Sequence, residues 1–134
     1  MGFYGSSIWL RDANRQCRVN WVVQSSAVDY LHCMLVLMRW LIKKFKIPAR
    51  LCISIHDELR YICPKPHMYQ VALALQSVAF FSSVEVDTCI RKESKDDCIT
   101  PSNSDGLQKG YGISPGQSIT IQDILDKTGG SMEL

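Results

Sequence analysis

The longest regular pattern in the sequence is an apolar stretch between Val19 and Lys46 that contains no glycine or proline. Its apolar residues recur at intervals of three and four, which is the spacing of one helical face. Pro48 disfavours helical backbone at the residue before it, so the helix should end there. We therefore predict one long, mostly buried helix, whose apolar face is formed by residues 27, 28, 31, 34, 35, 38, 41, 42 and 45.

The pattern then changes from helical spacing to alternation. Residues 51–55 and 59–63 each alternate in the way that half-buried strands do, which predicts an antiparallel hairpin with its turn at 56–58. Pro64 closes the second strand, and residues 67–76 regain the spacing of a helix. A small antiparallel sheet should therefore follow the long helix.

The remaining third of the chain has shorter patterns. Val84 and Val86 alternate with acidic residues and predict a strand, whereas residues 94–118 are rich in glycine, proline and polar residues and predict a loop. The stretch Thr120-x-x-Asp123 resembles a capping box for a short final helix that ends near Gly129. Together these elements predict an α+β fold in which the long helix packs on the small sheet.

Composition and charge add modest constraints. A chain of 134 residues that is 46% hydrophobic is the size of one globular unit. Residues 1–76 carry ten Lys and Arg against four Asp and Glu, while residues 77–134 carry five against nine. The basic first part suits a polyanionic partner, although a solvated surface without a partner has the same composition.

The cysteines and the apolar stretch bear on the compartment. None of the six cysteines forms a Cys-x-x-Cys pair, so we expect reduced thiols, with Cys33 and Cys52 as small core residues.

The apolar stretch is interrupted by polar side chains at Gln24, Asp29 and Arg39. A bilayer core would penalise them, and we therefore expect no membrane insertion.

The polar residues of the hairpin turn are His56, Asp57 and Glu58. Charged residues between strands often serve only to form the turn and to face water. A tight turn between rigid strands also holds a carboxylate in a fixed position, as a magnesium site requires. Two such ions can hold the attacking and leaving oxygens of a phosphoryl transfer.

One carboxylate does not make such a site. Adjacent residues on a strand point to opposite faces, so Asp57 and Glu58 are poorly placed to chelate the same ion. Further candidates in this chain are Asp29, Glu85 and Asp87, and no spacing singles one of them out. If one of them lay beside Asp57, a small metal-dependent phosphohydrolase would be an alternative function.

Five stretches in this order resemble the C-terminal palm of family A DNA polymerases, and within that family the mitochondrial replicative enzymes. The resemblance covers residues 18–134, and residues 1–17 form a divergent N-terminal segment. The five stretches are RVNWVVQSSAVDYLH (18–32), CISIHDELRY (52–61), VAFFSSVEVD (78–87), TPSN (100–103) and YGI (111–113).

The resemblance implies roles for residues of the turn. Asp57 matches the motif C aspartate, which binds catalytic Mg²⁺ together with a second aspartate from motif A. Glu58 matches a neighbouring acid that supports the site, and His56 a residue close to the primer terminus. The function implied is template-directed addition of deoxynucleotides to a primer.

The resemblance also implies partners. Asn20 and Gln24 match helix positions that contact template and primer, where amides can probe minor-groove acceptors, and Arg18 would contact DNA beside them. The partners implied are primer–template DNA, deoxynucleoside triphosphates and an accessory subunit, in mitochondria.

The sequence departs from the family pattern in two respects. No motif A strand precedes Arg18, so the chain by itself should not polymerise. Gln76 abuts Ser77 where the family has a further connection, and a helix cut at that junction should leave apolar surface uncovered. The alternative is therefore a non-catalytic isoform that binds nucleic acid or an accessory subunit.

Overall fold

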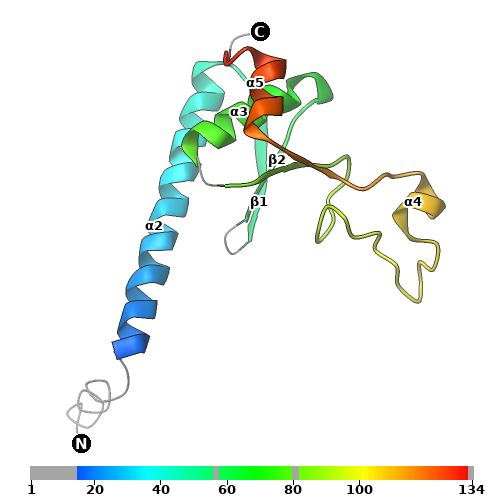
Figure 1. Ribbon diagram of the computed structural model, residues 1–134, viewed down its shortest axis with the longest axis horizontal. Helices are drawn as coiled ribbons and strands as arrows, with labels where there is room; N and C mark the ends of the chain where they lie inside the picture. Colours follow the sequence, from blue (N-terminus) through cyan, green and yellow to red (C-terminus); the bar gives the residue numbers. More distant parts are fainter. Residues whose placement is uncertain (1–14, 56–57, 80–81, 133–134) are drawn as a thin grey trace, which may run out of the picture. The chain divides into compact units, whose positions relative to one another are not determined.

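A computed structural model describes residues 15–55, 58–79 and 82–132, with side chains from Asn20 onward. The chain divides after Leu37 into two units, residues 1–37 and 38–134, and each is described by itself. Figure 1 follows the elements along the sequence.

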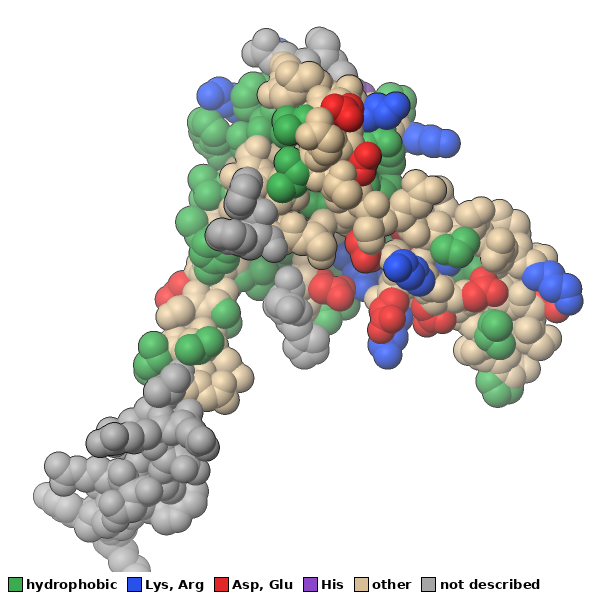
Figure 2. Space-filling model, in the orientation of Figure 1, with side chains coloured by type: hydrophobic (Ala, Val, Ile, Leu, Met, Phe, Trp, Pro, Cys, Tyr) green, Lys and Arg blue, Asp and Glu red, His purple; other side chains and the backbone are tan. Residues whose placement is uncertain are grey.

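The predicted long helix is α2, Arg15–Lys44, and a turn follows it before Pro48. The prediction that it is mostly buried is wrong for the described side chains. Trp21 is 71% exposed, Val36 is 68% exposed, and Met38 alone is buried between Asn20 and Lys44. The reason is that no residue between Asn20 and Leu37 belongs to a buried cluster of the described part of the chain. Hydrophobic side chains accordingly lie on the surface of this segment in Figure 2.

The same helix has the length and composition of a membrane span. The segment Asn20–Lys44 has a mean hydropathy of 1.2 in its most apolar window. Core helices of soluble proteins meet the same criterion, and this segment carries ionisable side chains at Asp29, His32 and Arg39. The absence of membrane insertion therefore stays a prediction.

The predicted hairpin consists of β1, Arg50–Ile55, and β2, Glu58–Ile62, in antiparallel pairing. The register runs from Arg50 opposite Ile62 to Ile55 opposite Glu58. It shifts between Leu51 and Ile53, so Cys52 is the extra residue of a β-bulge. The strands therefore form as predicted, with Glu58 belonging to β2 rather than to the turn.

The first part of the core joins α2, the hairpin and the next helices. After the short helix η1, Lys65–His67, the chain forms α3, Met68–Val78, which passes through the Gln76–Ser77 junction without a break. Buried residues of α2 and α3 meet here, and Tyr61 of β2 packs against them. The buried members of this cluster are Met38, Ile47, Val71 and Ala74.

A second cluster lies on α3 and joins the C-terminal elements. Strand β3, Val84–Val86, pairs with β4, Gln117–Ile119, and helix α5 spans Ile121–Thr128. The buried side chains Ala72, Val84 and Ile124 of α3, β3 and α5 pack together. The α+β prediction is confirmed, as are β3 and the final helix with its capping box.

The prediction of a loop across residues 94–118 is wrong at two places, because this stretch contains α4, Gly106–Tyr111, and most of β4. Contacts distant in sequence decide the outcome. The Asp97 carboxylate accepts a hydrogen bond from the Gln108 N–H at 2.7 Å, at the start of α4. Gly106 has a φ of +69° and lies so close to Asp97 that a Cβ would collide with it.

The cysteine prediction is partly wrong. Cys33 and Cys52 are exposed rather than part of the core, because Cys33 lies on the exposed segment of α2 and every residue of β1 is exposed. All five described cysteines are free thiols, and the reduced state of the chain stays a prediction.

Replacing Ile124 with alanine should destabilise the C-terminal core. The side chain is 1% exposed, and such a truncation in a core costs about 2 to 5 kcal/mol. The matched control is Ile121→Ala on the same helix, where the side chain is 41% exposed. Urea unfolding should show a clear drop in the midpoint for Ile124→Ala and a small one for Ile121→Ala; equal drops would contradict the packing described above.

Stability should depend on pH through the cap of α5. The Thr120 side chain and backbone N–H both donate to the Asp123 carboxylate, and these hydrogen bonds lower the pKa of Asp123. A lowered pKa in the folded state contributes stability above the unfolded pKa of 3.8, and this contribution is lost as pH falls through the folded value.

The pH test compares two variants by thermal unfolding. Asp123→Asn should be less stable than the natural chain at pH 7. The difference in stability should disappear at pH values below the folded pKa of Asp123. Asp126→Asn removes the same charge from α5 without touching the cap. An Asp123→Asn deficit that is constant across the pH range would argue against the cap as its cause.

Candidate active site

The candidate site is the corner between β1 and β2. Because Ile55 pairs with Glu58, only His56 and Asp57 connect the two strands. Both lie outside the described residues, so the predicted roles of His56 and Asp57 remain predictions. Glu58, the third predicted residue, is the first residue of β2 and is exposed.

Glu58 is bound by the next residue on the same face of its strand. Side chains two positions apart on a strand point to the same side. The Arg60 Nη2 donates to Glu58 Oε2 at 2.9 Å, which forms an ion pair. Glu58 is therefore held beside a cation at the end of the hairpin that adjoins Asp57 in sequence.

Arg60 also reaches a segment thirty residues further along the chain. Its Nη2 donates to the Lys92 carbonyl at 2.8 Å, and its Nη1 donates to the Arg91 carbonyl. The hairpin is thus joined through one guanidinium to the segment that follows β3.

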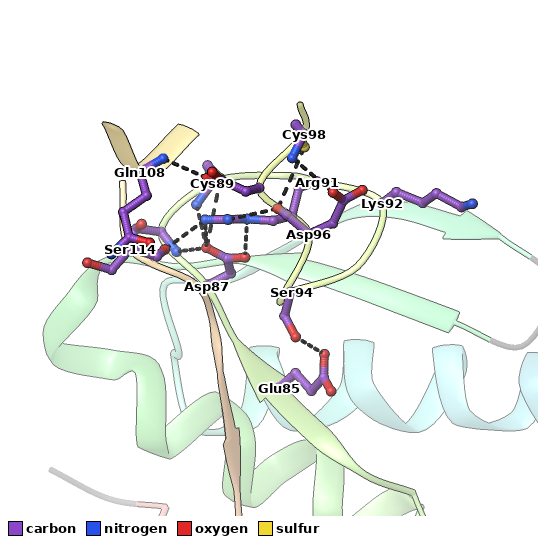
Figure 3. Close-up of polar contacts among 12 residues, drawn as sticks. Glu85, Asp87, Cys89, Arg91, Lys92, Ser94, Asp96, Cys98, Gln108 and Ser114 are labelled. Atoms are coloured by element: carbon purple, nitrogen blue, oxygen red, sulfur yellow. Dashed lines mark hydrogen bonds and ion pairs between the residues drawn. The ribbon is translucent and has the colours of Figure 1, made fainter. Parts of the chain in front are cut away.

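That segment is organised around a buried arginine (Figure 3). The Arg91 side chain is 1% exposed, and its Nε lies 2.8 Å from Asp87 Oδ2. Its other nitrogens donate to Asp87 Oδ1 and to the carbonyls of Asp96 and Ser114, at 3.0, 3.1 and 2.8 Å. Burial lowers the pKa of the Arg91 guanidinium, but the hydrogen bond and charge of Asp87 outweigh it, so that the net pKa is raised.

Two of the three acidic residues considered as further metal ligands have other partners. Asp87 is bound to Arg91, and Glu85 accepts hydrogen bonds from the hydroxyls of Ser94 and Ser118. Asp29 is exposed on α2. Within the described ranges, no three His, Cys, Asp or Glu side chains are grouped in a way that could hold a metal ion. These partners weaken the phosphohydrolase alternative, which needs one of these carboxylates free beside Asp57.

The residues predicted to contact DNA lie on α2. Asn20 and Gln24 are exposed and four residues apart, which places them on one side of the helix. Arg18 lies in the same helix, and its side chain is outside the described part. The helix therefore presents two amides together, and their role in binding stays a prediction.

Two groups on β2 and directly after it have raised pKa values. Burial raises the pKa of the Tyr61 hydroxyl and of the Cys63 thiol. Tyr61 and Cys63 both pack against the first core cluster. Their chemistry is that of core residues, so they are poor candidates for a nucleophile or a base.

Sequence reasoning missed Arg60 and Arg91. Arg60 carried a signal, because its spacing of two from Glu58 puts both on one strand face. Arg91 is four residues from Asp87, a spacing that pairs side chains in helices, but this segment is not helical. Its burial comes from the fold of residues 87–116, and no local pattern indicates it.

Comparison with known proteins places the chain in a family. Residues 5–91 match the family described as DNA polymerase family A. The chain belongs to this family. The match begins before the expected boundary at residue 17, and that boundary itself stays a prediction.

Curated relatives are polymerase subunits. The chain is 49% identical to DNA polymerase subunit gamma-1 of Gallus gallus and 50% identical to that of Xenopus laevis, over 87% and 84% of its length. It is 48% identical to the mitochondrial subunit gamma-1 of Drosophila melanogaster, over 85% of its length. The chain spans only 21%, 11% and 12% of these three relatives.

The alignments also contain a consistent gap. The match to the chicken protein extends over 137 residues and 87% of this chain, which is about 117 of its 134 residues. The relative therefore has about 20 residues in this region without a counterpart here. This agrees with the interpretation that a segment of the family is missing from the chain; its position at Gln76–Ser77 stays a prediction.

Proposed function

We propose that this chain is the C-terminal palm part of a mitochondrial replicative DNA polymerase, which adds deoxynucleotides to a primer under the direction of a template. Membership of family A and the similarity to gamma subunits support the proposal. The observation that carries it is the hairpin, because its register leaves His56 and Asp57 as the only connection and places Glu58 at the start of β2.

The donor set at this corner suits magnesium. Asp57 and Glu58 offer carboxylate oxygens, which are the ligands that Mg²⁺ prefers. In the proposed reaction Asp57 would hold the metal and His56 would lie near the primer terminus. Bound Mg²⁺ would supply stabilisation of the charge that develops on the phosphate oxygens during attack by the primer 3′ hydroxyl. Glu58, held by Arg60, would support Asp57 from the strand.

A second acidic residue would have to come from another strand. The sheet has an unpaired edge at which a further strand could pair. Within the described residues β1 pairs only with β2, so its outer edge has unpaired backbone groups. All six residues of β1 are exposed. A strand that carries the motif A aspartate could pair at this edge and approach the corner.

The proposed DNA contacts come from α2. Asn20 and Gln24 would reach minor-groove acceptors of the newly formed pairs, and Arg18 a phosphate or base nearby. The exposure of both amides supports this assignment. Deoxynucleoside triphosphates and an accessory subunit complete the proposed partners, and the mitochondrial matrix is the proposed compartment.

The 134-residue chain by itself should not extend a primer. The reason is that catalysis needs a carboxylate pair, and the carboxylates of Asp87 and Glu85 are bound to other groups. The measurement is incorporation of labelled nucleotide on a primer–template with Mg²⁺. Processive synthesis by the purified chain would contradict the proposal that it is an incomplete palm.

Joining the chain to the upstream palm of a gamma subunit should create an active enzyme that depends on Asp57. Asp57→Asn should lower incorporation by about 100- to 1,000-fold, since loss of a charge-stabilising group at a transition state costs about 10²–10³ in rate. Asp126→Asn on α5 removes the same charge elsewhere and should leave the rate unchanged. Equal activity of Asp57→Asn and the parent would refute the metal role of Asp57.

A non-catalytic isoform is the second candidate. The gap of about 20 residues relative to the chicken protein favours it, as do the exposed apolar side chains of α2. Such a chain would shift primer–template DNA or bind an accessory subunit in a salt-dependent way without incorporation. Inactivity of the joined enzyme, combined with such binding, would decide for this candidate.

A further inference from the structure

The Arg60 side chain connects the candidate catalytic corner to a separate part of the fold. It has three acceptors: the Glu58 carboxylate on its own strand and the carbonyls of Arg91 and Lys92. An arginine fork holds several acceptors in a fixed arrangement, which a lysine cannot do. The side chain is 26% exposed, so these contacts are partly shielded from water.

The far end of this connection is held by several hydrogen bonds and an ion pair. The Arg91 carbonyl accepts from Arg60, while the Arg91 guanidinium is buried against Asp87 and the carbonyls of Asp96 and Ser114. The Gly116 N–H donates to the Ser94 carbonyl at 2.7 Å and closes the same loop. The carbonyls that receive Arg60 therefore belong to a segment with few ways to move.

We propose that Arg60 is a positioning residue that fixes Glu58 at the start of β2 by bracing this strand against residues 91 and 92. The inference rests on the proposed function for its catalytic consequence. Glu58 is the residue through which Arg60 acts, because it lies next to Asp57 in sequence and takes one of the Arg60 donors. Without the brace, the contacts that hold Glu58 within the described part of the chain are those of strand pairing with Ile55.

The structural half of the proposal is tested on the 134-residue chain by hydrogen exchange. Arg60→Met keeps most of the aliphatic stem and removes the donors. It should raise amide exchange across residues 91–96 and at the start of β2 by about tenfold relative to the parent. The control is Lys109→Met, which breaks an exposed ion pair of 2.8 Å with Asp105 on α4. Exchange equal to that of the control would overturn the brace.

The catalytic half is tested by single-turnover incorporation in the joined polymerase. Arg60→Met should slow the rate per active molecule by about 10- to 100-fold, because misplacement of a reacting group by about 1 Å has effects of this size. The Mg²⁺ concentration for half-maximal rate should rise, and Arg60→Lys should restore part of the rate. A purely structural role would lower the burst amplitude and leave the rate and the Mg²⁺ midpoint unchanged, and that result would overturn the proposal.

The two proposals fail in different ways. An inactive parent enzyme would defeat the proposed function, and the exchange experiment would still decide whether Arg60 braces the hairpin. An active parent with Arg60→Met as fast as Lys109→Met would defeat the positioning role alone. The double variant Glu58→Gln with Arg60→Met should be no slower than the slower single variant, since both act through one contact; additive losses would contradict action through Glu58.

Discussion

The burial of the Arg91 guanidinium is the constraint on which the C-terminal half of the structure depends. A charged group that is removed from water must find a counter-ion and acceptors for its donors. Arg91 has Asp87 as its counter-ion, and its two terminal nitrogens donate to Asp87 and to the carbonyls of Asp96 and Ser114. These residues lie up to 23 positions away, so satisfying one side chain closes the long segment between β3 and β4. Figure 2 shows charges of both signs intermixed on the surface of this region.

The burial of Arg91 also affects the candidate site, through the backbone carbonyls of Arg91 and Lys92. Closing residues 87–116 around Arg91 fixes where the carbonyls of Arg91 and Lys92 lie, and these carbonyls receive Arg60 from β2. A buried ion pair in one part of the fold therefore defines the surroundings of Glu58 in another. This connects segments that the sequence separates by about thirty residues, and it passes through polar contacts rather than through the hydrophobic core.

The elements that sequence patterns predicted well are those whose formation is local. Helix α2 follows from apolar spacing without glycine or proline, the hairpin from two alternating runs, and the cap of α5 from Thr120 and Asp123. Helix α4 was missed because Asp97, nine residues before it, supplies acceptors for its first N–H groups. The burial of α2 was predicted wrongly because spacing reveals an apolar face and does not reveal what covers it. Of the site, the turn and the family resemblance predict roles for the corner residues, and these roles stay predictions. The spacing of Arg60 from Glu58 indicates their pairing, while the contacts of Arg60 with residues 91 and 92 and the burial of Arg91 depend on tertiary structure that no local pattern contains.

The exposed apolar part of α2 and the unpaired edge of β1 are both surfaces that are stabilised when further protein structure covers them. Apolar side chains such as Trp21 and Val36 gain free energy when covered, and the backbone groups at a strand edge gain partners when another strand pairs. The proposed chemistry needs a second carboxylate near Asp57, which a strand paired along β1 could carry. Additional polymerase structure along β1 would complete the sheet and supply the missing acid. The requirement for a complete metal site and the requirement for a covered apolar surface each call for further protein structure, and only the first of them is specific to a polymerase.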